Sequence, residues 1–353
     1  MPFEESMTSI ERILAVSSGQ KVDRVPVMPE IGAVSRHLLG VTYREYSKDV
    51  NALVKCQLEA QEFIGHDLLL PHPDLCIESA DFGGATIFPL DDTPYSDPSK
   101  WLIKNLKDYK IVKKFSWDKA KRMKNFCTAI RKLFEATGDT LPIVGWTVGP
   151  MGTLIRLRKT DDLVRDWVYH KEELHEVLDF ITHILCEYVE MQVEAGAIAV
   201  SIVPVMAEKE IMSRKMWEEL DAPYQKRITN AIEKSGGLVI CHTCGRGPYF
   251  DELIKWFHPI AIQSAFLPDD CKSEVELVKK YGKETIFMGY LNTTLLGYGT
   301  PKEVMAECKR EIKVFGGPGR KYILGSGCEY PSWAPLYNAI AMVKAARTYG
   351  VYE

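Results

Sequence analysis

The stretch LVICHTCGRGPYFDELIKWFHPIAIQSAFLPDDCKSEVELVKKYGKETIFMGYL, residues 238–291, decides the fold. It contains three short apolar runs, LVICHT (238–243), AIQSAF (261–266) and IFMGYL (286–291), and a helical pattern follows each of them. Runs this short are typical of buried strands, whereas the segments between them are long enough for helices. Strands that alternate with helices predict a parallel sheet with helical crossovers.

The same alternation extends over the rest of the chain. A capping box formed by Thr8 and Glu11 predicts a helix ahead of the first strand. Eight strand-helix units fit a (β/α)8 TIM barrel of the α/β class. Because no Pro/Gly/Ser-rich linker divides the 353 residues, we expect a single domain over 1–353. The other five predicted strands are VPVMPE (25–30), DLLLP (67–71), PIVGWT (142–147), IAVSIV (198–203) and YILGSG (322–327).

Two segments exceed what a barrel requires. The β-branched residues and the Gly-Gly pair of 76–98 predict a β-hairpin insertion near the barrel mouth. The span 151–196 predicts two helices between the third and fourth strands. With the N-terminal helix, these segments account for most of the excess over a barrel of about 250 residues.

Composition excludes several classes of function. The net charge is −4, and no like-charged run suggests a nucleic-acid arm or a membrane-surface helix. The longest apolar stretches fall far short of the roughly 20 residues that cross a bilayer. The first residues, MPFEESMTSIER, carry acids where a signal peptide carries bases, so we expect a cytoplasmic protein. Its nine cysteines, an odd number, argue against a disulfide framework.

Active sites of TIM barrels lie at the C-terminal ends of the strands. Polar and aromatic side chains at or just after the predicted strand ends are therefore the candidates for a site. They are Glu30, His72, Asp74, Trp146, Met206, Glu208, His242, Cys244, Gln263, Tyr290, Asn292, Cys328 and Glu329.

Three of these candidates have the chemistry of a metal site. Because side chains alternate along a strand, His242 and Cys244 share a face, and Cys241 points to the other one. Cys328 follows the last strand in GSGCEYP, where the glycines allow the chain to turn over the mouth. One histidine and two cysteines make a catalytic zinc site with an open fourth position. The alternative is the polar end of an ordinary buried strand, since a lone H-x-C is a weak motif.

The chain resembles a known family over essentially its whole length. The segments that carry the resemblance are TSIERILAVSSGQKVDRVPVMP (8–29), GPMGTLIRL (149–157), ICHTCGR (240–246) and YILGSGCEYPSWAPLYNAIAMVKAARTYGVY (322–352). They look like the uroporphyrinogen decarboxylase superfamily, and within it like the zinc-dependent corrinoid methyltransferases. That branch includes methylcobalamin:coenzyme M methyltransferases and O-demethylase methyltransferases.

The resemblance implies the site and its cofactors. It carries the zinc ligands over to His242, Cys244 and Cys328, and it implies a cobalamin or other corrinoid held by a partner protein. A corrinoid is too large to enter a barrel, so we expect that partner to dock over the mouth, on the predicted hairpin and the neighbouring loops. A small methylated substrate is the other expected partner. Nucleic acid and membrane are not expected, and a homodimer is left open.

The same comparison argues against the decarboxylase that names the superfamily. That enzyme binds its substrate, a porphyrinogen with four carboxylic acids, through an arginine-rich motif, R-Q-A-G-R-Y. The corresponding stretch here, VMPEIGAVSRHL (27–38), has Arg36 alone and an acid, Glu30, where positive charge would be wanted. A pocket without clustered guanidinium groups is a poor host for a polycarboxylate. A decarboxylase-like enzyme and a metal-binding barrel without turnover remain as minor alternatives.

Two methyl transfers would use such a zinc site. One moves a methyl group from a methoxylated aromatic compound to Co(I), and the other moves it from a methylcorrinoid to a thiol of the coenzyme M type. The predicted rim is aromatic and apolar, with no obvious basic anchor for a sulfonated thiol apart from Arg246, so we favour O-demethylation. The predicted substrate-binding residues are Trp146, Met206, Phe266, Trp333 and Asn292.

A leaving phenolate needs a proton donor. Glu329, next to Cys328, and Glu78 in the predicted hairpin are candidate acids. Tyr290 stands in MGYLNTT where family members often have asparagine, and its phenol is the third predicted catalytic group.

Overall fold

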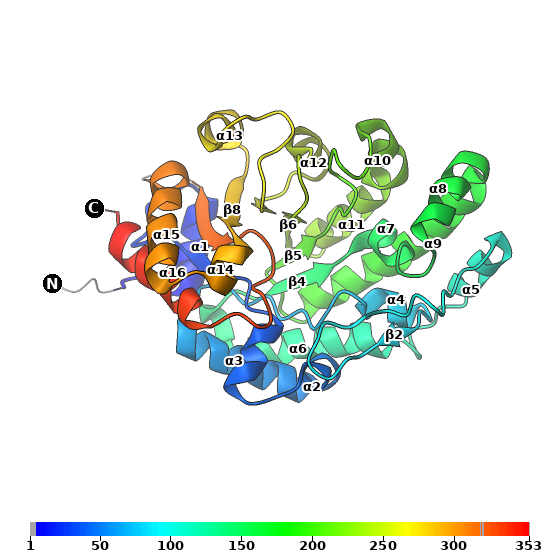
Figure 1. Cartoon of the computed structure of the whole chain (residues 1–353), viewed down its shortest axis with the longest axis horizontal. Coiled ribbons are helices and arrows are strands. Elements are labelled where there is room, and N and C mark those ends of the chain that lie inside the picture. The colour runs from blue at the N-terminus through cyan, green and yellow to red at the C-terminus, as the bar shows by residue number, and fades with distance from the viewer. Residues whose placement is uncertain (1–4, 318, 320, 353) are drawn as a thin grey trace.

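A computed structural model describes residues 5–317, 319 and 321–352. It confirms the predicted barrel, with parallel strands at the centre and helices around them (Figure 1). Seven strands form one parallel sheet in the order β1-β9-β8-β7-β6-β5-β4. They are β1 (Val27–Met28), β4 (Val144–Thr147), β5 (Ala199–Ile202), β6 (Leu238–Thr243), β7 (Ala261–Ser264), β8 (Ile286–Leu291) and β9 (Tyr322–Ser326).

The predicted strand 67–71 is not a regular strand. It makes one isolated parallel bridge, between Leu69 and Ile143. The amide of Asp67 donates to the carbonyl of Val27 at 2.8 Å, and the carbonyl of Leu69 accepts from the amide of Val144 at 2.8 Å. Since β1 and β4 are the two edges of the sheet, this extended segment takes the eighth place of the barrel.

The crossovers between parallel strands are helical, as predicted. The capping box of Thr8 and Glu11 opens the first helix. The longer helices are α1 (Ser9–Ser17), α3 (Val50–Ile64), α6 (Lys121–Thr137), α8 (Thr160–Tyr169), α9 (Lys171–Glu194), α11 (Ala222–Lys234), α12 (Phe250–Phe257), α13 (Glu274–Tyr281), α15 (Pro301–Phe315) and α16 (Tyr337–Tyr349). The short ones are η1 (Ala33–Leu38), α2 (Tyr43–Lys48), α4 (Ile77–Asp81), η2 (Leu106–Asp108), α5 (Tyr109–Val112), η3 (Gly138–Thr140), α7 (Gly149–Leu154), α10 (Arg214–Leu220) and α14 (Thr293–Tyr298).

The main hydrophobic core lies between the strands and these helices. Helix α11 shows why the helices pack as they do: Ile228 and Ile232, one turn apart, are both fully buried. Strand residues such as Val200 and Ile202 are fully buried as well. Strands that are covered on both faces have continuous apolar sequences, which explains the short apolar runs from which the strands were predicted. Among the described helices, none has the length and apolar character needed to cross a membrane.

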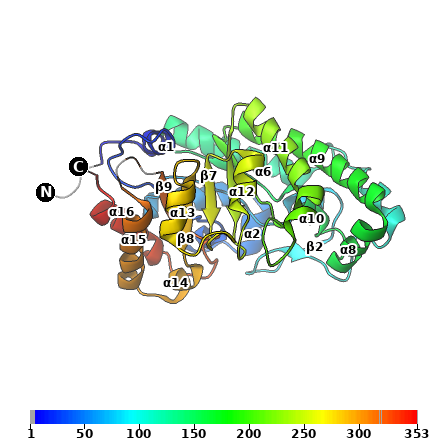
Figure 2. The ribbon, with the colours of Figure 1, turned by 90° about the horizontal axis from the view of Figure 1, so that it is seen from above.

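The predicted hairpin is present but shorter than 76–98. Strands β2 (Thr86–Ile87) and β3 (Tyr95–Ser96) pair antiparallel, while Ile77–Asp81 forms helix α4 instead. Figure 2 shows the hairpin at the same end of the barrel as α14, which follows the C-terminal end of β8. The Arg44 guanidinium donates to the Phe88 carbonyl at 2.8 Å, so the hairpin packs on α2 at the edge of the mouth.

Helix α1 lies at the opposite end of the barrel (Figure 2) and is held there by a buried ion cluster. The carboxylate of Asp67 accepts from the guanidinium of Arg12 at 2.7 Å and from that of Arg24 at 2.6 Å. It also accepts from the amide of Val27 at 2.7 Å. The side chains of Asp67 and both arginines are 1% exposed, so α1, β1 and the 67–71 segment share one desolvated charge network.

Asp67→Asn is therefore expected to destabilise the fold strongly. It removes a buried carboxylate from both guanidinium groups, which keep Asp23 and Glu5 as their remaining partners. Breaking a buried ion pair in this way costs about 3–5 kcal/mol. The measurement is urea unfolding of the variant beside the parent chain. Glu176→Gln is the matched control, because Glu176 pairs with Lys113 at an exposed site, where such pairs contribute about 1 kcal/mol or less. Equal losses in the two variants would contradict this assignment.

Candidate metal centre

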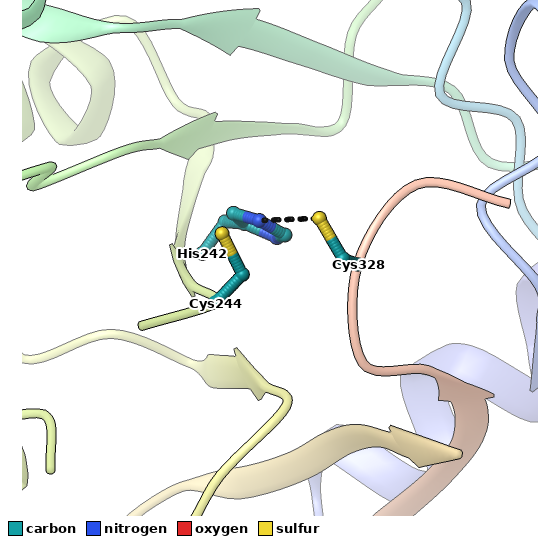
Figure 3. A group of neighbouring side chains, drawn as sticks. All are labelled: His242, Cys244 and Cys328. Carbon is teal, nitrogen blue, oxygen red and sulfur yellow. Dashed lines mark hydrogen bonds between the residues drawn. The ribbon is translucent and has the colours of Figure 1, made fainter. Parts of the chain in front are cut away.

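The structure brings His242, Cys244 and Cys328 together (Figure 3). His242 lies near the end of β6, Cys244 directly follows that strand, and Cys328 lies two residues beyond β9. One ligand atom from each side chain lies within 4.8 Å of the others. The Cys328 Sγ is 3.8 Å from the His242 Nε2. This is the grouping predicted from the sequence, formed across two strands that are far apart in the chain.

Strand alternation sets which cysteine takes part. His242 is 3% exposed and faces the barrel interior, whereas Cys241 is fully buried on the other face of β6. Cys244 is exposed and Cys328 is partly exposed. The cluster is thus closed on the imidazole side and accessible on the sulfur side, the arrangement needed to hold an ion and admit a ligand.

The orientation of the His242 ring is fixed by Gln263, its register partner on β7. The Gln263 amide nitrogen donates to Glu30 Oε2 at 2.5 Å and to the Ser326 carbonyl at 3.1 Å. A carbonyl and a carboxylate only accept, so the Gln263 oxygen must face His242 Nδ1, 2.9 Å away. His242 therefore donates from Nδ1, and its Nε2 faces the sulfurs as a metal ligand would.

The electrostatics of the cluster favour a cation. Burial alone would lower the pKa of His242, but the Glu30 carboxylate and the Cys244 thiol raise it to about 9. The neighbouring Cys328 thiol raises the pKa of Cys244, whereas His242 acts in the opposite direction. A divalent cation beside Cys244 would stabilise its thiolate form.

A second polar group, absent from the predicted catalytic set, lies beside the cluster. Glu30 and His72 are each 2% exposed, and His72 Nε2 is 3.6 Å from Glu30 Oε1. Burial opposes ionisation of Glu30, but His242 and His72 lower its pKa below the usual range. Both residues, and Gln263, were among the candidates at the predicted strand ends, but no role was predicted for any of them.

Glu329 interacts electrostatically with both members of this group. Burial raises the pKa of its carboxyl, while His72 acts in the opposite direction. Its Oε1 sits so close to Gly32 that a Cβ there would lie 2.3 Å away. The absence of a side chain at Gly32 thus makes room for this carboxyl.

Two of the predicted substrate-binding residues, Trp146 and Met206, are buried, whereas Phe266 lies at the surface. Trp146 is 3% exposed, with its ring 5.5 Å from that of His242, and it stacks on His72 at 4.8 Å. Met206 is buried in the loop after β5. Phe266 is at the surface, where the Arg246 guanidinium lies 4.9 Å over its ring. Arg246 is thereby engaged at the rim and not free as an anchor deeper in the barrel.

Tyr290 does not join the site. Its ring stacks on Phe315 of α15 with centroids 4.8 Å apart. Regular alternation from Met288 would point Tyr290 inward, but Gly289 and Tyr290 have φ values of 99° and 74°. This left-handed turn of the backbone reverses the alternation and sends the phenol outward. The prediction of a catalytic phenol is corrected by this local geometry.

Three other predicted residues have structural contacts instead. Asn292 caps α14, since its side-chain oxygen accepts from the amide of Thr294 at 2.7 Å. Trp333 is 54% exposed and packs against Tyr298 of α14 at 4.7 Å. Glu78 accepts from the Thr147 hydroxyl and the Val148 amide, both at 3.0 Å, and so ties α4 to the end of β4.

Comparison with known proteins agrees with this architecture. The chain is 26% identical over 347 residues to the methylcobamide:CoM methyltransferase MtbA of Methanosarcina mazei, covering 97% of this chain and 98% of that protein. It is 21% identical over 355 residues to the uroporphyrinogen decarboxylase of Anaeromyxobacter dehalogenans, covering 96% and 99%. A solved methyltransferase structure from Methanosarcina mazei has the same fold, with a TM-score of 0.80 at 20% identity over 97% of this chain and 98% of that one.

The family profile described as uroporphyrinogen decarboxylase (URO-D) matches residues 8–349. That range contains the barrel strands and all three residues of the cluster. The chain therefore belongs to the uroporphyrinogen decarboxylase (URO-D) family.

Proposed function

We propose that this chain is a zinc-dependent corrinoid methyltransferase that moves the methyl group of a methoxylated aromatic compound to the Co(I) corrinoid of a partner protein. The observation that carries the proposal is the convergence of His242, Cys244 and Cys328, with the sulfurs accessible at the mouth. The relatives named methylcobamide:CoM methyltransferases support methyl transfer with a corrinoid.

The donor set fits zinc. One imidazole nitrogen and two sulfurs match the soft ligands that zinc takes, and three protein ligands leave a fourth position for substrate. When bound, zinc would polarise an ether oxygen or hold a thiol as its thiolate. Gln263 orients His242 for this role through the 2.9 Å hydrogen bond to Nδ1.

The other side chains of the site have separate tasks in this proposal. As the methyl group leaves for cobalt, the ether C–O bond breaks and the phenolate oxygen must take up a proton. Glu329 is the proposed donor, because burial raises its pKa and lets the carboxyl hold a proton. Trp146 offers an aromatic surface 5.5 Å from the His242 ring, against which an aromatic substrate would pack.

Transfer from a methylcorrinoid to a thiol is the second candidate. The names of the MtbA relatives favour it. The charge of the Glu30 carboxylate argues against a sulfonated thiol, since its hydrogen bonds and ion pairs among the described residues include no lysine or arginine. The same acid makes the interior a poor host for the polycarboxylate of a decarboxylase.

Purified chain is expected to hold about one zinc ion. Cys244→Ala and Cys328→Ala are each expected to lose it, because two remaining ligands bind zinc weakly. Metal content is measured by mass spectrometry after purification without chelator. Cys186→Ser is the control, since Cys186 lies on α9 outside the cluster and should keep the metal. Full zinc content in both alanine variants would refute the ligand assignment.

Gln263→Leu is expected to weaken zinc binding without removing a ligand. Loss of the hydrogen bond that orients a metal-bound histidine typically lowers metal affinity about 10–100-fold. Competition with a coloured chelator measures the affinity. Gln57→Leu is the matched control: Gln57 is also fully buried and hydrogen-bonded, to the Ile31 carbonyl and Tyr46. Similar affinities for the two variants would mean that Gln263 does not orient His242.

The direction of transfer is tested with purified zinc-loaded chain and a corrinoid protein. With a methoxylated aromatic donor and Co(I), we expect the absorption spectrum of methylcorrinoid to appear. Glu329→Gln should slow this reaction about 100-fold or more, as removal of a general acid commonly does. Turnover only of methylcorrinoid with a thiol would replace the first candidate by the second.

A further inference from the structure

Three residues inside the barrel have buried polar atoms without a hydrogen-bond partner. The atoms are both ring nitrogens of His72, Nε1 of Trp146 and Oγ of Ser201. The three residues are 2%, 3% and 1% exposed, respectively. Buried polar atoms are nearly always hydrogen-bonded, because an unsatisfied one costs about 1–3 kcal/mol. Three such residues on neighbouring strands and strand ends indicate a polar arc that awaits a ligand.

The polar arc lies on neighbouring strands beside the candidate metal centre. Trp146 on β4 is the register partner of Ser201 on β5, and Ser201 is the partner of Ile240 on β6. Register partners share a face, and Ile240 and His242 share one by alternation, so Ser201 faces the same side as His242. His72 joins the arc through its ring, which stacks on Trp146 with an interplanar angle of 24°.

A negative charge lies beside the polar arc, because the Glu30 carboxylate is 3.6 Å from His72. No lysine or arginine bonds to Glu30 within the described part of the chain. An anionic ligand would therefore meet a carboxylate at short range inside a desolvated site, where like charges repel strongly.

The hydrogen-bonding capacity of the polar arc is mixed. Because His72 Nε2 faces a carboxylate, Nε2 carries a proton, and Nδ1 accepts a hydrogen bond when the ring is neutral and donates one when the ring is protonated. The Trp146 indole can only donate, and the Ser201 hydroxyl can do both. Among uncharged ligand groups, a hydroxyl satisfies such a set well, because it donates one hydrogen bond and accepts others.

We propose that His72, Trp146 and Ser201 form a specificity site that binds the hydroxyl group of an uncharged substrate. The inference rests on the proposed methyl transfer and narrows its substrate class from methoxylated aromatics in general to methoxyphenols. Carboxylated aromatics and sulfonated thiols are disfavoured by the Glu30 carboxylate. The three residues position the substrate, while the cluster of His242, Cys244 and Cys328 faces its methyl-bearing atom.

The test is binding to the zinc-loaded chain, measured by isothermal titration calorimetry. The ethers are 2-methoxyphenol, its anionic counterpart 2-methoxybenzoate and its hydroxyl-free counterpart 1,2-dimethoxybenzene. We expect 2-methoxyphenol to bind about tenfold or more tightly than either, because the other two leave buried polar atoms unpaired or add a repelled charge. Equal or tighter binding of 2-methoxybenzoate would overturn the proposal.

Three variants distinguish recognition of the substrate hydroxyl from simple packing of these side chains against the ligand. His72→Phe, Trp146→Phe and Ser201→Ala keep most of the shape but remove the polar atom. Each should weaken 2-methoxyphenol about three- to tenfold, the usual effect of one hydrogen bond, and leave 1,2-dimethoxybenzene unchanged. Glu30→Gln should narrow the gap between 2-methoxyphenol and 2-methoxybenzoate. Equal weakening of both uncharged ethers in all three variants would show a packing role only and refute recognition of the hydroxyl.

A pair of thiols distinguishes failure of this inference from failure of the proposed donor. The pair is 2-mercaptoethanol, which is uncharged and carries a hydroxyl, and 2-mercaptoethanesulfonate, which is anionic. If no ether binds but 2-mercaptoethanol binds more tightly than the sulfonate, the specificity site stands and the ether donor is wrong. Tighter binding of the sulfonate, with or without ether binding, would overturn the specificity site.

Discussion

The site depends on one side-chain amide, that of Gln263. It bridges four of the barrel strands and their ends, because it sits on β7, accepts from His242 of β6, and donates to Glu30 after β1 and to the Ser326 carbonyl of β9. An amide has one accepting and one donating end, so these partners allow a single orientation. That orientation sets which nitrogen of His242 faces the sulfurs, and it places a carboxylate near the imidazole.

Two left-handed residues shape the interior around this bridge. Glu30 has φ of 49° and Tyr290 has φ of 74°, in a region that side chains other than glycine rarely adopt. Strain of this kind costs about 1–3 kcal/mol per residue and persists where surrounding contacts hold it. At Glu30 it accompanies a buried acid hydrogen-bonded to Gln263, whereas at Tyr290 it turns a large phenol out of the barrel toward Phe315. Together the two conformations place the Glu30 carboxyl near the His242, Cys244 and Cys328 cluster and keep the Tyr290 phenol away from it.

The sequence was sufficient to predict the barrel and, with the family resemblance, the grouping of His242, Cys244 and Cys328. It predicted the hairpin with wider bounds than the paired strands have. Apolar runs mark strands, alternation selects Cys244 over Cys241, and both cysteines come at strand ends. The predictions were wrong where the backbone departs from regular strand or helix geometry. Tyr290 was chosen for its place at a strand end, but the left-handed backbone at Gly289 and Tyr290 turns its side chain outward. The 67–71 run holds its place through a few backbone hydrogen bonds and not a regular ladder. Asn292 was assigned to substrate although it precedes a helix, where its side chain caps.

Charge balance links the cluster to the polar arc. Glu30, and both sulfurs if deprotonated, would place three negative charges around the Gln263 bridge, with His72 as the nearby group that can become positive. Such an excess is costly in a desolvated interior, so a divalent cation among His242, Cys244 and Cys328 would bring the interior close to neutrality. Once that balance is reached, an added anion has no counter-charge left to pair with. A cation held by the proposed ligand set and the Glu30 carboxylate beside it are therefore both consistent with the proposed uncharged substrate, which hydrogen bonds would hold.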